Sequence, residues 1–103
     1  MMGPGKADLL DHIAATGSIS AAARAMEMSY KRAWMLVETM NAAFAEPLVI
    51  RTRGGANRGG ATLTPTGEAV LGHYRALEAR AAEAGATDIA ALGAMLRTAS
   101  ADD

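Results

Sequence analysis

The fold of this chain is decided by residues 17–34, which read GSISAAARAMEMSYKRAW. Ser20 is expected to cap a short helix, and the alanines that follow it let a second helix cross at close range. Met26-Glu27-Met28 places apolar side chains on both sides of a turn, and Ser29 is a second N-cap that opens a longer helix through about Asn41. Two helices that meet at a sharp angle in this way form a helix-turn-helix motif.

The chain around this motif is short and rich in helix-forming residues. It has 103 residues, half of them apolar and only 4% aromatic, which favours one mostly α-helical domain. The absence of cysteine excludes a disulfide framework and a thiolate metal site. No run of 18 apolar residues occurs, and residues 1–5 lack the plan of a signal peptide, so a cytoplasmic protein that does not enter a membrane is expected.

Hydrophobic periodicity and capping residues place the other elements. A helix over residues 8–16 ends at Gly17, and the helix from Ser29 repeats apolar residues at Ala33, Val37, Met40 and Phe44. Strands are expected at 48–53 and 61–63 with a glycine-rich tip between them. Thr64 and Pro65 start a helix to about Ala84, Gly85 breaks it, and a last helix covers 88–98 before a frayed acidic tail.

This order predicts a mostly α winged helix-turn-helix fold with a three-helix core, a β-hairpin wing, a long fourth helix and a short C-terminal helix. Residues 5–84 are expected to form the nucleic-acid-binding domain with its dimerisation helix, and residues 85–103 the short helix and tail. An ordinary pair of helices with a cationic, solvated face is the alternative interpretation of the motif.

Charge is distributed unevenly along the chain, although the net charge is only −1. Residues 29–58 carry a net charge of +3, whereas the chain from residue 76 onwards carries −3. A basic middle and an acidic tail would orient the protein on a polyanion, although a charge run is often only a solvated face.

Residues 17–53 resemble the N-terminal domain of LysR-type regulators, in the runs Ser20-Ala21-Ala22-Ala23-Arg24-Ala25 and Pro47-Leu48-Val49-Ile50-Arg51. A more specific resemblance links the chain to the DNA-binding domain of the ModE-type, molybdate-responsive repressors over roughly residues 5–84. It is carried by Ser29-Tyr30-Lys31, Ala33-Trp34, Met40-Asn41, the glycine-rich tip and Leu63-Thr64. The resemblance implies a homodimer that binds double-stranded DNA at a two-fold operator. It also implies dimerisation through the first and fourth helices.

The expected DNA-binding residues lie in the recognition helix 29–41, at helix N-termini and in the wing 51–60. Tyr30, Lys31 and Trp34 face outwards, and Lys31 is the expected donor to a base or phosphate. Trp34 is expected to pack against the turn with its indole edge visible rather than to contact a base. The complete set is Ser18, Ser20, Ser29, Tyr30, Lys31, Arg32, Trp34, Arg51, Arg53 and Arg58.

Apolar residues on the first and fourth helices exceed what a domain of this size can cover, which independently favours a dimer. The expected interface consists of Leu9, Leu10, Ile13, Val70, Leu71, Tyr74 and Leu77. The two half-sites would then lie about one DNA turn apart, or a multiple of it.

Other functions find less support in the sequence. His12 and His73 have no acidic neighbours in sequence, and the methionines at helical spacing are typical core residues, so no enzyme, metal site or cofactor is expected. Binding of molybdate is not expected either. A flexible hairpin tip remains the alternative for the wing, and a protein-interaction module that pairs with a larger regulator remains the alternative function. Burial of Arg51, Arg53 and Arg58 in ion pairs would favour that module.

Overall fold

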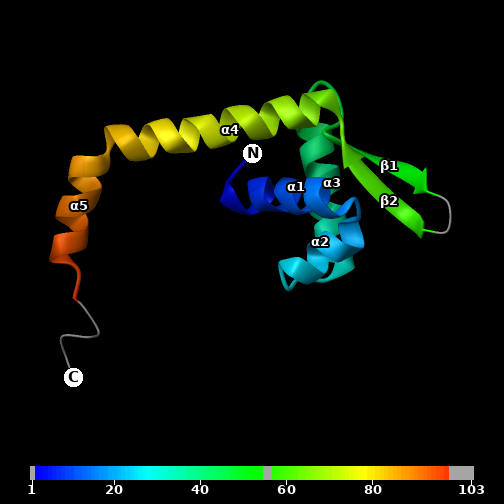
Figure 1. Ribbon diagram of the computed structural model, residues 1–103, viewed down its shortest axis with the longest axis horizontal. Coiled ribbons are helices and arrows are strands. Elements are labelled where there is room, and N and C mark those ends of the chain that lie inside the picture. Colours follow the sequence, from blue (N-terminus) through cyan, green and yellow to red (C-terminus); the bar gives the residue numbers. More distant parts are fainter. Residues whose placement is uncertain (1, 55–56, 98–103) are drawn as a thin grey trace.

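The computed structural model describes residues 2–54 and 57–97, with the side chains of residues 53–59 outside the description (Figure 1). The elements are α1 (Pro4–Thr16), α2 (Ile19–Ala25), α3 (Tyr30–Ala43), β1 (Val49–Gly54), β2 (Asn57–Leu63), α4 (Pro65–Ala84) and α5 (Ala86–Met95). The predicted winged helix-turn-helix fold, with its long fourth helix, is confirmed.

The helix-turn-helix is shaped by its end residues. Gly17 ends α1 with φ 70°, a left-handed conformation that glycine adopts without strain. The prediction that Ser20 caps α2 is wrong: the Ser18 hydroxyl accepts the bond from the Ala21 N–H at 3.0 Å. Ser18 is the extended residue before the first helical turn, whereas Ser20 already lies inside the helix. Ser29 caps α3 as predicted and accepts from the Arg32 N–H at 3.0 Å.

The hydrophobic core lies between α1, α2, α3 and the base of the hairpin. Ala33, Val37 and Met40 of α3 are buried in it, which confirms the predicted stripe. Its largest side chains that are almost completely buried are Leu9, Leu10, Ile13, Val37, Met40 and Leu48. The predicted dimer interface included the three of these residues that lie on α1, and this part of the prediction is wrong. Leu9, Leu10 and Ile13 are covered within one chain because α2 and the hairpin base pack over them.

The hairpin pairs Val49 with Leu63 and Thr52 with Gly60 in an antiparallel register, with an irregularity between Thr52 and Gly54. Its second strand begins at Asn57, earlier than predicted, because glycines conceal the strand pattern while main-chain pairing supports it. Gly60 also pairs with Ser18, and the Ala61 N–H donates to the Gly17 carbonyl at 2.9 Å. The corner between α1 and α2 thereby holds the base of the wing.

The start of α4 is built against the segment before β1. The Thr64 hydroxyl accepts from the Gly67 N–H at 2.9 Å and donates to the Pro47 carbonyl at 2.7 Å. Gly67 lies directly against the Leu48 carbonyl, where a side chain would collide with the main chain. The predicted N-cap at Thr64 is thus confirmed, and it fixes the direction in which α4 leaves the hairpin.

Farther along α4, Arg75 ties the helix to α1. Its guanidinium donates to Asp8 at 2.7 Å, to Asp11 at 2.5 Å and to Glu78 at 2.9 Å. These hydrogen bonds, that to Asp8 foremost, raise the pKa of Arg75 above its ordinary value. The cluster joins two elements that are far apart in the sequence.

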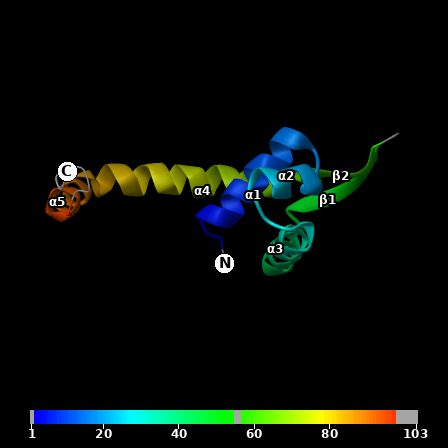
Figure 2. The same cartoon turned by 90° about the horizontal axis from the view of Figure 1, so that it is seen from below.

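Beyond this cluster, α4 and α5 extend away from the rest of the molecule as an arm (Figures 1 and 2). The chain bends at Gly85, and α5 turns toward the side of α4 on which α1 lies (Figure 1). No residue of α5 is buried. Among the described residues, none of the helices combines the length and the apolar character needed to cross a membrane.

Candidate nucleic-acid interface

The first turn of α3 presents polar groups to solvent. Tyr30 is 46% exposed, and Lys31 and Arg32 are also exposed. Because Ser29 accepts a main-chain N–H, this turn is held in a fixed conformation. The exposed N-terminal turn of a helix offers N–H groups and a positive dipole end, both of which favour phosphate.

Arg51 of β1 joins the wing to this helix. Its Nη2 donates to the Tyr30 hydroxyl at 2.9 Å, and its guanidinium carbon lies 4.3 Å from the centre of the Trp34 ring. Tyr30 and Trp34 are one helical turn apart, so one planar cation spans both. The wing and the recognition helix therefore form one continuous surface, and the exposed Arg51 is its centre.

Trp34 serves both the core and this surface. It is half-buried and packs against the core, as the sequence indicated, while the ring face carries Arg51. That second contact could not be predicted from the sequence, since 17 positions separate Trp34 from Arg51. That Trp34 makes no direct contact with a base stays a prediction.

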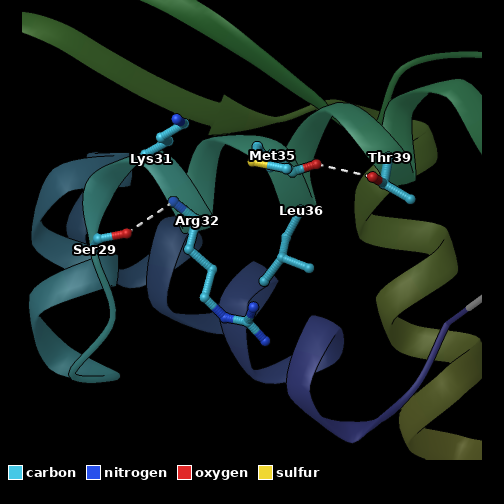
Figure 3. A pocket seen from close by; sticks show the side chains of 6 residues that line it. All are labelled: Ser29, Lys31, Arg32, Met35, Leu36 and Thr39. Atoms are coloured by element: carbon cyan, nitrogen blue, oxygen red, sulfur yellow. Dashed lines mark hydrogen bonds between the residues drawn. The ribbon is translucent and has the colours of Figure 1, made fainter.

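Lys31 and Arg32 point to opposite sides of α3 (Figure 3). Both border a hollow of about 250 Å³, together with Ser29, Met35, Leu36 and Thr39. Arg32 and Leu36 also border a second hollow, of about 260 Å³, beside the start of α1. Arg32 thus lies at the edge that faces α1, and Lys31 lies away from that edge.

The other predicted residues differ in how they are placed. Ser18 is engaged as the α2 cap, and the Ser20 hydroxyl accepts from Arg24 at 3.1 Å. The side chains of Arg53 and Arg58 lie outside the described residues, although their backbones belong to β1 and β2.

Arg75 forms ion pairs with Asp8, Asp11 and Glu78, whereas the described contacts of Arg51 are with Tyr30 and Trp34 and not with a carboxylate. Within residues 2–54 and 57–97, no group of three or more His, Cys, Asp or Glu side chains could hold a metal ion. The arrangement that would favour a protein-interaction module is therefore not found at Arg51.

Sequence reasoning missed Asn41 as a positioning residue. Its Oδ1 accepts from the Leu48 N–H at 2.8 Å and the Val49 N–H at 3.1 Å, and its Nδ2 donates to the Val49 carbonyl at 3.0 Å. This side chain fastens the end of α3 to the start of β1. The only sequence signal is an amide side chain shortly before a proline and a strand, which is weak.

These elements define the class of a regulatory winged helix-turn-helix protein. Residues 6–68 match the family described as bacterial regulatory helix-turn-helix protein, lysR family. The fold is similar to that of the CbnR DNA-binding domain in a crystal structure with DNA, with a TM-score of 0.69 and 24% identity over 88% of this chain and 99% of that one.

Two curated relatives refine this placement. The chain is 49% identical over 82 residues to the molybdenum-pterin-binding protein MopB of Rhodobacter capsulatus, covering 80% of this chain and 30% of that protein. It is 42% identical over 71 residues to the DNA-binding transcriptional dual regulator ModE of Escherichia coli K12, covering 69% and 27%. The chain spans under a third of the length of these relatives.

The chain therefore belongs to the LysR family of bacterial regulatory helix-turn-helix proteins. Its likeness to MopB and ModE confirms the expected resemblance to the N-terminal domain of ModE-type regulators. A family of regulators also agrees with the expectation that the chain is not an enzyme.

Proposed function

We propose that this chain is a DNA-binding transcriptional regulator that acts as a homodimer on a two-fold operator. In this proposal α3 enters the major groove and the hairpin lies on the backbone or in the adjacent minor groove. The observation that carries it is the placement of Arg51 across Tyr30 and Trp34, which makes the wing and α3 one rigid surface. The description of ModE as a DNA-binding regulator and the complex of the CbnR domain with DNA support the choice of DNA as the partner.

Each exposed group has a role that follows from its position. Lys31 is the donor to a base edge or phosphate because it is exposed on the first turn of α3. Arg51 supplies several N–H donors, and only one of them is used by Tyr30. Ser29, Ser18 and Ser20 lie at or near helix N-termini that favour the DNA backbone. Arg53 and Arg58 extend the same positive charge along the hairpin.

Titration of a labelled duplex at several salt concentrations tests the DNA partner. The logarithm of the association constant should fall linearly with the logarithm of salt concentration, since phosphate contacts release counterions. Arg51→Ala should weaken binding about 5- to 30-fold and reduce the slope by about one, because a phosphate contact and the positioning of Tyr30 are lost together.

Arg80→Ala is the matched control for Arg51→Ala, because Arg80 is an exposed arginine on the arm. It should leave both the affinity and the slope unchanged. An affinity that does not depend on salt, or equal effects of the two substitutions, would contradict the proposed surface.

The proposed dimer pairs α4 with α4 and does not use α1, because the expected residues of α1 are buried in the core. Val70, Leu71 and Tyr74 are half-buried, and Leu77 is 60% exposed. A two-fold axis through this stretch pairs the two helices antiparallel and sets the two recognition helices apart on the same face of the DNA. Half-sites about one turn apart, or a multiple of it, follow from that geometry.

Sedimentation equilibrium of the Leu77→Glu variant tests the dimer. A carboxylate in the centre of an apolar interface is desolvated without a partner, so the dissociation constant should rise at least tenfold. Ala79→Glu is the control, because Ala79 is exposed and lies on the other side of α4. A wild-type chain that remains monomeric at tens of micromolar would overturn the dimer while leaving the DNA proposal in place.

A further inference from the structure

The helix α5 has no covering element among the described residues. Its large apolar side chains are exposed: Ile89 57%, Leu92 64%, Met95 80% and, at its C-cap, Leu96 71%. Ile89, Leu92 and Leu96 recur at the spacing of one helix face. Because a helix of 10 residues is marginal on its own in water, its folded state needs a surface that covers this face.

The place of α5 relative to α4 limits where that surface can be. The α4 helix has 20 residues and is about 30 Å long. Its start lies at the hairpin, and α5 begins at its other end (Figure 1). The body of the same chain, formed by α1–α3 and the hairpin, therefore covers α4 only as far as the middle of the helix, where Arg75 is fastened to α1.

A hollow of about 290 Å³ lies at the start of α4. It is bordered by Glu46, Pro47, Thr64, Pro65 and Thr66. The two prolines present rigid apolar rings, and the Thr66 hydroxyl is held by Glu46 at 2.5 Å. The hollow and α5 lie at opposite ends of α4. The α5 of the same chain therefore cannot reach the hollow.

An antiparallel pair of α4 helices removes this separation. When the pair is centred near Tyr74, midway between Leu71 and Leu77, the end of one α4 lies beside the start of the other. The bend at Gly85 then carries α5 toward the body of the second copy, because α5 turns to the side of α4 on which the body lies (Figures 1 and 2).

We propose that α5 of each chain docks into the Pro47–Thr66 hollow of a second copy of this chain, so that the dimer is closed by two reciprocal contacts beside the α4 pair. This inference rests on the proposed homodimer. It assigns to α5 the function of holding the base of the partner's hairpin, since Pro47 and Thr64 lie where α3, β1, β2 and α4 meet.

Disulfide trapping between two differently substituted chains tests the contact. Because the chain has no native cysteine, only the introduced cysteines can form a disulfide. One chain carries Leu92→Cys and the other Thr66→Cys, and the two are mixed, left to exchange and oxidised. A mixed disulfide dimer is expected. Replacing Thr66→Cys by His73→Cys, at an exposed position in the middle of α4, should abolish the product.

Tyr74→Cys, oxidised alone, reports separately on the α4 pair. A Tyr74→Cys dimer without the Leu92–Thr66 product would overturn the docking of α5 and leave the homodimer standing. Failure of both would overturn both. A chain that carries both Leu92→Cys and Thr66→Cys and closes within itself would also overturn the proposal.

The Leu92→Glu variant gives a measurement that needs no disulfide. The dimer dissociation constant should rise about tenfold, whereas the control Ala94→Glu, at an exposed position on the opposite face of α5 from Leu92, should change it less than twofold. Equal effects of the two substitutions would contradict the assignment of the docking face.

Discussion

The body of the molecule, α1–α3 with the hairpin, and the arm, α4–α5, have similar apolar patterns but opposite burial. Leu9, Leu10 and Ile13 of α1 are completely covered, whereas Leu77 of α4 and the large residues of α5 are more than half exposed. In both regions, leucine and isoleucine recur at helical spacing. Periodicity therefore identifies which helix face is apolar enough to be buried. Only the tertiary structure shows whether the same chain buries that face.

This difference explains the error in the predicted interface. The residues of α1 and α4 were grouped because their total apolar surface exceeds what three short helices cover. The hairpin base and α2 cover α1 completely, and nothing comparable lies on the outer half of α4. Within the described part of the chain, only the α4 members of the predicted set remain available to a partner.

The largest expected difference between body and arm is in the effect of replacing one leucine in each region by alanine. Leu10→Ala should lower the free energy of unfolding by about 2–5 kcal/mol, because it opens a cavity in the core. Leu77→Ala should change it by less than about 0.5 kcal/mol at concentrations where the chain is monomeric. Urea unfolding followed by circular dichroism measures both, and a similar loss for both variants would show that body and arm share one core.

A smaller effect is expected where the hairpin is fastened to α3. Asn41→Ala removes the acceptor of two main-chain N–H groups and should lower the free energy of unfolding by about 1–3 kcal/mol. Hydrogen exchange at the amides of Leu48 and Val49 should accelerate, while exchange in the outer turns of α4 stays unchanged.

Asn41→Asp retains the acceptor and loses only the donor to the Val49 carbonyl. It should therefore protect the two amides better than Asn41→Ala does. If both variants leave the exchange of Leu48 and Val49 unchanged, Asn41 is not the fastening of the hairpin.

The body was more predictable from sequence than the contacts that orient it. Gly17, Ser29 and Thr64 act through local rules of helix ends, so they could be placed without knowledge of the fold. The choice between Ser18 and Ser20 was wrong because both precede the alanine run, and only the backbone conformation decides between them. The early start of β2 was missed because its glycines have no strand preference.

The long-range contacts had no comparable signal. Arg51 reaches Tyr30 across 21 positions, and Arg75 reaches Asp8 across 67. Each depends on the relative position of elements that pattern reasoning treats one at a time. The predicted site contained Arg51 as a cation for DNA, and the structure adds its position between the wing and α3.

The smallest expected effect concerns molybdate, which is predicted to leave this chain unchanged. A tetrahedral oxyanion is selected by several donors that converge on one point. On the arm, the guanidinium of Arg75 already donates to three carboxylates. Arg80 and Arg97 are exposed and lie 17 positions apart, on α4 and just beyond α5.

Calorimetry with molybdate and tungstate on the full chain should show no binding heat, and the affinity for duplex DNA should stay within twofold. Micromolar binding that shifts the DNA affinity would contradict this prediction, because coupling of that kind requires a second site on the chain. It would also change the comparison between the two regions, since the arm would then bind an effector as well as a second copy.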